Sequence, residues 1–162
     1  MHFHRGSALA TPFAGATFDR GYMLHVWINI ADKHALFAEV TRVIKPGGRF
    51  GVYDVMRTGP VELIFPVPWA TTPDINALAA PEVYRAALRA SGFELVAERN
   101  RRDFAIEFFR VPRERMARAG GPPPLGLHLV MGRDARAKVE NMIANVEAGT
   151  IAPVEIIARR AA

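Results

Sequence analysis

The chain has 162 residues, of which 50% are hydrophobic, and this suits a single domain with a real core. It contains no cysteine, which excludes disulfide bonds and thiolate metal sites. The formal net charge of +5 comes from 18 arginines and 3 lysines interleaved with 16 acids, a pattern typical of a salt-bridged surface more than of a nucleic-acid partner. No apolar run reaches the roughly 18 residues of a membrane span, and we expect a soluble cytoplasmic protein.

The first thirteen residues have an ambiguous pattern. His2–Arg5 alternates weakly, which predicts either a short strand or a frayed terminus before a loop. Gly6-Ser7-Ala8 then marks a turn. The two histidines of the first segment have the spacing of a strand pair, but the sequence places no third ligand beside them, so we predict no metal site.

Residues 18–55 have the pattern of a strand, a helix and a second strand. The apolar run Tyr22–Val26 predicts a short buried strand. Asp32 is a plausible N-cap for a helix whose apolar residues recur at three- and four-residue spacing. The turn Lys45–Gly48 ends that helix, because proline disfavours helical geometry before it. Arg49–Val55 is the next strand, and the three elements together predict a right-handed parallel unit.

Residues 57–80 contain four prolines and scattered aromatic residues, which excludes a regular helix. A loop of this length predicts a lid or binding loop, or else a loop whose aromatic residues pack on its own core. Residues 103–132 are a second possible lid. Within them a surface helix over 103–118 would need a break or kink at Pro112. Helices over 81–90 and 134–148 and strands over 93–98 and 151–158 complete the prediction.

Two runs in the first third carry a family resemblance. FDRGYMLHV and the later NIADKHALFAEVTRVIKPGGRFGVYDV resemble the centre of the type 11 S-adenosylmethionine-dependent methyltransferases, which act on small molecules. There they correspond to the fourth strand, its helix, a Lys-Pro-Gly-Gly turn and the fifth strand. The resemblance implies a single α/β domain over residues 1–162 with a three-layer Rossmann-like sheet. It also implies that the last strand lies, antiparallel, between the strands that begin near Phe50 and Phe93.

One family hallmark is missing from the sequence. The family places Gly-x-Gly-x-Gly after its first strand, where the backbone approaches the cofactor, and an acid after its second strand. Neither occurs in this chain. The sequence therefore looks like the C-terminal two-thirds of such an enzyme, truncated at its N-terminus and with an incomplete sheet. An exposed sheet edge invites pairing, so we expect a homodimer through the N-terminal strand or the Tyr22 strand.

The resemblance also assigns candidate site residues. It implies S-adenosylmethionine as cofactor and methyl transfer to nitrogen, oxygen or carbon of a small molecule. The cofactor side falls to Ser7, Ala8 and the strand end Leu24, His25 and Val26. The remaining candidates face substrate: Asp54, Trp69 and His128.

His25 and His128 are the candidate catalytic bases, because unperturbed histidine titrates near neutrality. Each candidate has a structural alternative: a hydrogen-bonded strand-end histidine, a core histidine, a loop cap at Asp54 or packing of Trp69 within its own loop. The competing function is a non-catalytic remnant that dimerises or serves as a partner subunit, without cofactor. Nucleic-acid binding is supported by charge alone.

Overall fold

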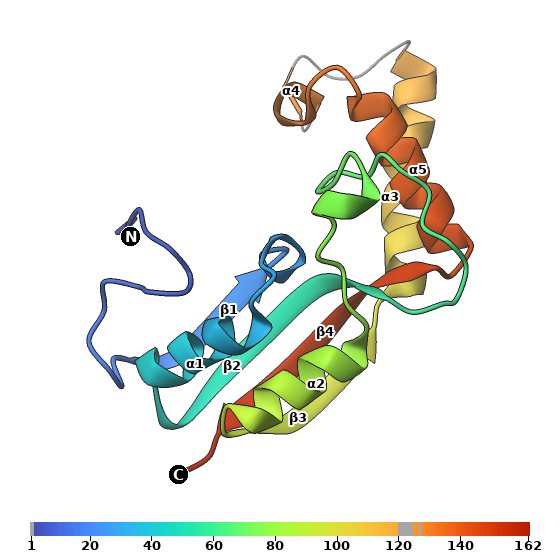
Figure 1. Ribbon diagram of the computed structural model, residues 1–162. Helices are drawn as coiled ribbons and strands as arrows, with labels where there is room; N and C mark the ends of the chain where they lie inside the picture. Colours follow the sequence, from blue (N-terminus) through green and yellow to red (C-terminus); the bar gives the residue numbers. More distant parts are fainter. Residues whose placement is uncertain (1, 120–124, 127) are drawn as a thin grey trace.

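The computed structural model describes residues 2–119, 125–126 and 128–162 (Figure 1). They form an α/β fold around a four-stranded sheet in the order β1-β2-β4-β3. β1 and β2 are parallel, whereas β4 is antiparallel to both of its neighbours. The predicted insertion of the last strand, and the parallel pairing of the first two, are therefore confirmed. The strands are β1 Phe18–Leu24, β2 Ile44–Arg57, β3 Phe93–Asn100 and β4 Ile151–Arg160.

The β1–β2 connection begins with a short 3-10 helix, η1 (Trp27–Asn29), and continues into α1 (Lys33–Val43). The predicted N-cap is confirmed, since Asp32 Oδ1 accepts a hydrogen bond of 2.9 Å from Ala35 N. β2 starts directly after α1, so the Lys-Pro-Gly-Gly turn belongs to the start of that strand. Gly47 has a φ of +75° there, a conformation that glycine adopts without strain.

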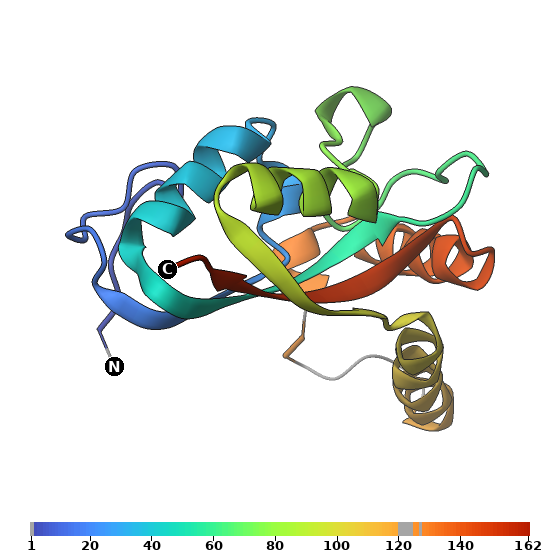
Figure 2. The same cartoon turned by 90° about the horizontal axis from the view of Figure 1, so that it is seen from below.

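α1 and α2 (Pro81–Ala90) lie on the same face of the sheet (Figures 1 and 2). The apolar stripe of each helix meets alternate residues of the strands, and this contact buries the main core. Burial of apolar area at about 25 cal/mol per Å² is the principal force that holds this layer to the sheet. The side chains of the main core include Trp27, Leu36, Phe37, Phe50, Val52, Met56, Tyr84, Leu88, Val154 and Ile156.

A second hydrophobic cluster covers the end of the sheet, where the loop over residues 58–80 meets α3 (Arg102–Ala119) and α5 (Ala135–Glu147). The loop contains η2 (Pro73–Ile75), and the short α4 (His128–Met131) precedes α5. The break expected at Pro112 is absent, because α3 runs through it as one helix. Proline removes one backbone bond, and the remaining bonds continue the helix.

The predicted N-terminal strand is wrong. Residues 2–6 are exposed, and only an isolated bridge between Ser7 and Ala10 is present in this segment. The segment is attached to α1 by side chains instead of by a strand ladder. Glu39 Oε1 accepts hydrogen bonds from the backbone and the hydroxyl of Thr11, at 2.7 and 2.5 Å, and Glu39 is also paired with Arg42.

Loss of the Glu39 carboxylate should release the N-terminal segment. The Arg42 hydrogen bond is the main cause that lowers the pKa of Glu39 to about 2. Because this folded-state pKa lies below the unfolded value, the stabilisation is present above about pH 4.5 and is lost as pH falls towards 2. We expect Glu39→Gln to cost roughly 1.5–3 kcal/mol at pH 7. Amide exchange at Thr11 and Thr17 should accelerate, and unchanged exchange would contradict the anchor.

Within the described residues, no helix combines the length and the apolar character that crossing a bilayer requires.

Candidate functional site

His25 directly follows β1, at the carboxyl edge of the parallel strand pair. Its backbone N–H donates 2.9 Å to Tyr53 O, which extends the β1–β2 ladder by one residue. Its φ of +53° lies in the left-handed region, which is uncommon for a residue with a side chain. The imidazole is 48% exposed, so it can reach a ligand. Ligands of parallel α/β sheets bind beyond this edge.

Asp54, on β2, is completely buried. Its Oδ2 accepts hydrogen bonds from Ile28 N and Tyr84 Oη, both at 3.2 Å, and its Oδ1 lies 3.7 Å from His25 Nδ1. The carboxylate therefore connects β2 to the residues after β1 and to α2. This placement favours a role in positioning His25, whereas the substrate contact expected from the sequence stays a prediction.

Lys33 is a residue of this region that sequence reasoning missed. Its Nζ donates hydrogen bonds to the carbonyls of Trp27, Ile30 and Ala77, at 2.8, 2.6 and 3.0 Å. Burial is the main cause that lowers the pKa of this amine to about 8, and the nearby charge of Asp54 opposes it. A lysine at the first position of a helix is electrostatically unfavourable, and this signal could have drawn attention to it.

Replacement of Lys33 by methionine should loosen the β1–α1 connection. The folded-state pKa of the amine lies below its unfolded value of 10.5, so the unfolded chain binds more protons between about pH 8 and 10.5. The Lys33 contribution to stability therefore rises with pH across this window. We expect Lys33→Met to unfold at lower urea concentration and to lose this rise. Equal pH slopes in both proteins would contradict the burial of the amine.

Trp27 begins η1, two residues after His25, and is fully buried. Its ring stacks on Tyr84 with centroids 3.8 Å apart and meets the edge of Phe37 at 4.3 Å. Its indole Nε1 has no acceptor among the described residues. The indole of Trp27 is therefore part of the main core, where it fixes the β1–α1 connection against α2.

The candidates on the cofactor side lie in different surroundings. Leu24 is exposed, while Val26 and Ala8 are both half-buried against the main core. Ser7 Oγ accepts a hydrogen bond of 3.1 Å from Leu9 N within an exposed turn. The structure therefore brings Ala8 and Val26 to one core, whereas the Ser7 hydroxyl serves its own turn. Their contact with a cofactor stays a prediction.

The candidates on the substrate side are spread more widely. Trp69 packs half-buried against the second hydrophobic cluster, and its Nε1 donates 2.9 Å to Asn76 Oδ1. Packing of the 57–80 loop on its own core is thus part of the structure, while its lid function stays a prediction. His128 begins α4, but its side chain lies outside the described residues. The second proposed lid, 103–132, also includes residues outside them.

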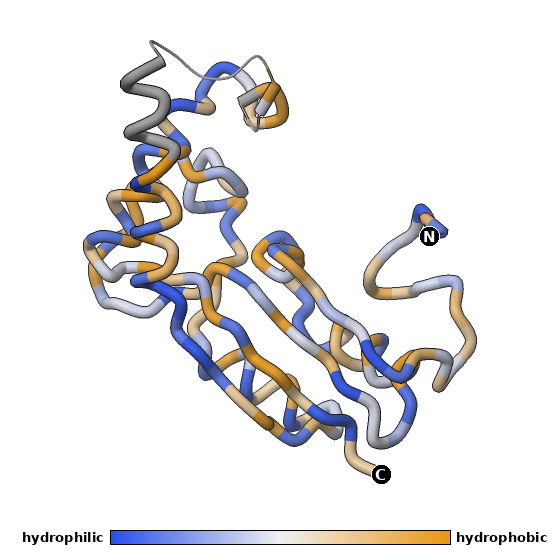
Figure 3. The backbone as a smooth tube through the Cα atoms, turned by 180° about the vertical axis from the view of Figure 1, so that it is seen from behind, coloured by the Kyte–Doolittle hydropathy of each residue, from blue (hydrophilic) through white to orange (hydrophobic). Residues whose placement is uncertain are grey.

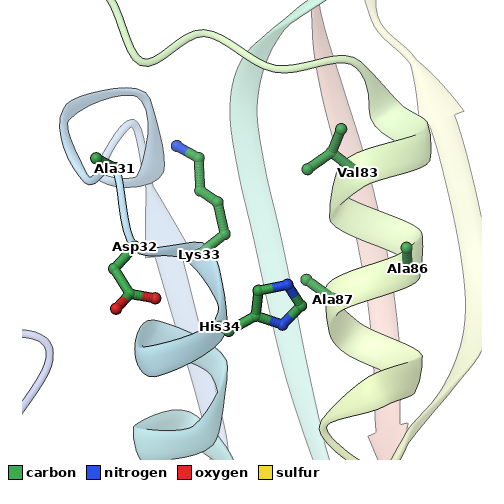
Figure 4. Close-up of a pocket in the computed structure, with 7 residues that line it drawn as sticks. All are labelled: Ala31, Asp32, Lys33, His34, Val83, Ala86 and Ala87. Atoms are coloured by element: carbon green, nitrogen blue, oxygen red, sulfur yellow. The ribbon is translucent and has the colours of Figure 1, made fainter.

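A groove of ≈ 310 Å³ lies between the N-terminal turn of α1 and α2 (Figure 4). Its lining includes Asp32, Lys33, His34 and Val83, and none of the site residues predicted from the sequence. Figure 4 places the His34 imidazole across the groove towards Ala87. The Lys33 side chain extends away from this imidazole, towards the loop that holds Ala31. Across the described residues, no group of three His, Asp or Glu side chains has the arrangement of a metal site.

Residues 1–52 match the family model for a methyltransferase domain. Among curated relatives, the chain is 29% identical to a sterol 24-C-methyltransferase of Eremothecium gossypii, over 64% of this chain and 29% of that protein. It is 26% identical to the O-methyltransferase cnsE of Penicillium expansum, over 59% of this chain and 35% of that protein. The chain thus spans about a third of these relatives.

Two solved structures share the fold. A proposed sarcosine dimethylglycine methyltransferase of Galdieria sulphuraria matches 96% of this chain with a TM-score of 0.76 at 19% identity, over 58% of its own length. Geranyl diphosphate C-methyltransferase of Streptomyces coelicolor, solved with S-adenosyl-L-homocysteine, matches 97% of this chain with a TM-score of 0.69 at 17% identity, over 52% of its own length. At these identities the structures establish the fold. Together with the family match, they confirm the resemblance and the incomplete Rossmann-like sheet.

Proposed function

We propose that this chain, part of a Rossmann-like methyltransferase domain by its fold and by the match of residues 1–52, takes part in methyl transfer from S-adenosylmethionine to a small molecule. The observation that carries the proposal is the position of His25. It follows the strand that pairs in parallel with β2, its side chain is half exposed, and a buried carboxylate lies beside one ring nitrogen. The relatives that match are named for methyl transfer to sterols and to oxygen.

The residues present fit one side of an adenosyl cofactor. Leu24, His25 and Val26 offer a strand end with an exposed apolar side chain and a polar ring, and Ala8 adds a small apolar residue at the same core. The sequence has no glycine-rich turn to hold the rest of the cofactor. When bound, S-adenosylmethionine supplies the methyl group on a sulfonium, so the protein mainly orients the reactants.

His25 is the proposed base for an acceptor that must lose a proton. Asp54 lies beside Nδ1, which favours the tautomer with its proton on that atom and leaves Nε2 to accept the proton of the acceptor. Trp69 and His128 are the proposed substrate contacts. His25→Ala should lower methyl transfer by about a hundredfold or more with the fold intact. His34→Ala, another exposed histidine, is the matched control.

The competing proposal is a non-catalytic subunit that dimerises. β1 pairs only with β2 among the described strands, so its other edge is open to a second chain. We propose a cytoplasmic homodimer formed at this edge. Analytical ultracentrifugation at tens of micromolar should give twice the chain mass of 17.9 kDa, and a purely monomeric protein would contradict the dimer. A dimer in which His25→Ala changes no activity would favour the non-catalytic subunit over the enzyme.

A further inference from the structure

One face of the sheet is left largely uncovered by the described residues. α1 and α2 occupy the opposite face, and α3 and α5 cover only the end of this one, around Val55 and Ile151 (Figure 2). On the remainder, the side chains of Tyr22 and Leu24 are 77% and 55% exposed. We call this surface the open face, and its members are Arg20, Tyr22, Leu24, Arg49, Gly51, Tyr53, Glu94, Ala97, Arg99, Glu155, Ile157 and Arg159.

The strand register places three arginines side by side on the open face. Arg20 pairs with Arg49 across β1 and β2, and Arg49 pairs with Arg159 across β2 and β4. Arg159 is neutralised by Glu94, at 2.7 Å. Among the described residues, no carboxylate lies within ion-pair distance of Arg20 or Arg49. Directly opposed like charges destabilise a sheet, so the isolated chain carries this row at a cost.

The next row on the same face is apolar. Tyr22 pairs with Gly51, and Gly51 pairs with Ile157, so an aromatic and an aliphatic side chain flank a strip with no side chain. Figure 3, which views the molecule from behind, shows hydrophobic and hydrophilic positions alternating along these strands. An exposed apolar patch beside a charged rim is typical of a protein-binding surface.

We propose that the open face docks an amphipathic helix of another polypeptide, with an apolar stripe over Tyr22, Leu24 and Ile157 and with carboxylates opposite Arg20 and Arg49. A shallow strip with a glycine at its centre admits an apolar helix face, and acidic side chains neutralise the two unpaired arginines. This interaction goes beyond the proposed methyl transfer, although the two share Leu24.

The charges of the open face decide between classes of partner. Glu94 and Glu155 share the face with the arginines, and its centre is apolar, which is unfavourable for a phosphate backbone. A second copy would bring its own arginine row and its net charge of +5 against this surface. In the two solved structures described above, the matched region is 58% and 52% of the chain, so further polypeptide accompanies this fold there.

Fluorescence anisotropy with two designed peptides tests the proposal on the full chain. Both peptides carry the same leucine stripe at helical spacing, but one has glutamates at one end where the other has lysines. We expect the acidic peptide to bind in about the micromolar range and more weakly at high salt. Arg20→Glu/Arg49→Glu should weaken it at least about tenfold and create binding of the basic peptide.

The matched control is Arg89→Glu/Arg133→Glu, which makes the same change of charge on exposed arginines away from the open face. It should leave the binding of both peptides unchanged. Tyr22→Ser/Leu24→Ser should weaken binding of the acidic peptide, since its leucine stripe lies over these residues, and circular dichroism checks that each variant folds. The proposal is overturned if neither peptide binds or if both bind equally well. It is also overturned if the control weakens binding as much as the test variant, or if Arg20 and Arg49 instead mediate self-association or binding to RNA or anionic vesicles.

Discussion

Replacing Asp54 with alanine should destabilise the protein by about 3 kcal/mol or more, the largest effect we expect from a single polar residue. The carboxylate is fully buried and accepts hydrogen bonds from Ile28 N and Tyr84 Oη. Without it, both donors remain buried and lack a partner, and the residues after β1 lose their tie to β2. Urea unfolding at pH 7, followed by circular dichroism, measures the change.

Two further variants separate charge from contact at this position. Tyr84→Phe removes one donor and should cost about 1 kcal/mol, because the other bonds to Asp54 remain. Asp54→Asn preserves the shape of the side chain but removes the charge beside His25. Its loss of unfolding free energy should lie between the losses of Asp54→Ala and Tyr84→Phe. If Asp54→Ala unfolded at the same urea concentration as the wild type, the carboxylate would not organise this region.

Trp27→Ala should cost about 3–5 kcal/mol, the range for removal of a large aromatic side chain from a core. The indole is fully buried between Phe37 and Tyr84, so its removal leaves a cavity between the β1–α1 connection and α2. Thermal unfolding should show a lower midpoint, and exchange of the Ile28 amide should accelerate.

Trp69 supplies the comparison for this variant. It is the chain's other tryptophan, it is half-buried in the second cluster, and it makes one hydrogen bond through its indole. Trp69→Ala should therefore cost less than Trp27→Ala. Equal losses from the two variants would mean that the second cluster is as important to stability as the main core, contrary to the burial of these two rings.

The sequence was sufficient to predict the parts of the fold that local patterns determine. The helix beginning after Asp32 has its N-cap in the sequence, and the α2 helix begins at Pro81 as expected. The position of β4 between β2 and β3 came from the family resemblance, because no local pattern fixes which strands become neighbours. The predicted starts of β1 and β2 were too late, since the strands begin at Phe18 and Ile44, in stretches that are not continuously apolar.

The candidate site was less predictable because its contacts join distant residues. Asp54 lies 26 residues from Ile28 and 30 from Tyr84, so no spacing rule could reveal that the carboxylate is buried by them. Lys33 reaches a carbonyl 44 residues away. The prediction of an N-terminal strand failed because residues 2–6 have no neighbouring strand among the described residues. The segment is held instead by side-chain hydrogen bonds to Glu39, which join residues 28 apart in the sequence. The open face likewise depends on register, which only the paired strands determine.

The most direct measurement is mapping by nuclear magnetic resonance of S-adenosylhomocysteine added to the labelled chain. We predict concentration-dependent shifts at the amides of Leu24, His25, Val26 and Ala8, with an affinity of about millimolar strength, since the chain supplies only one side of the ligand's surroundings. Shifts confined to other regions, or none at saturating ligand, would contradict the view that the tip of β1 belongs to a cofactor site.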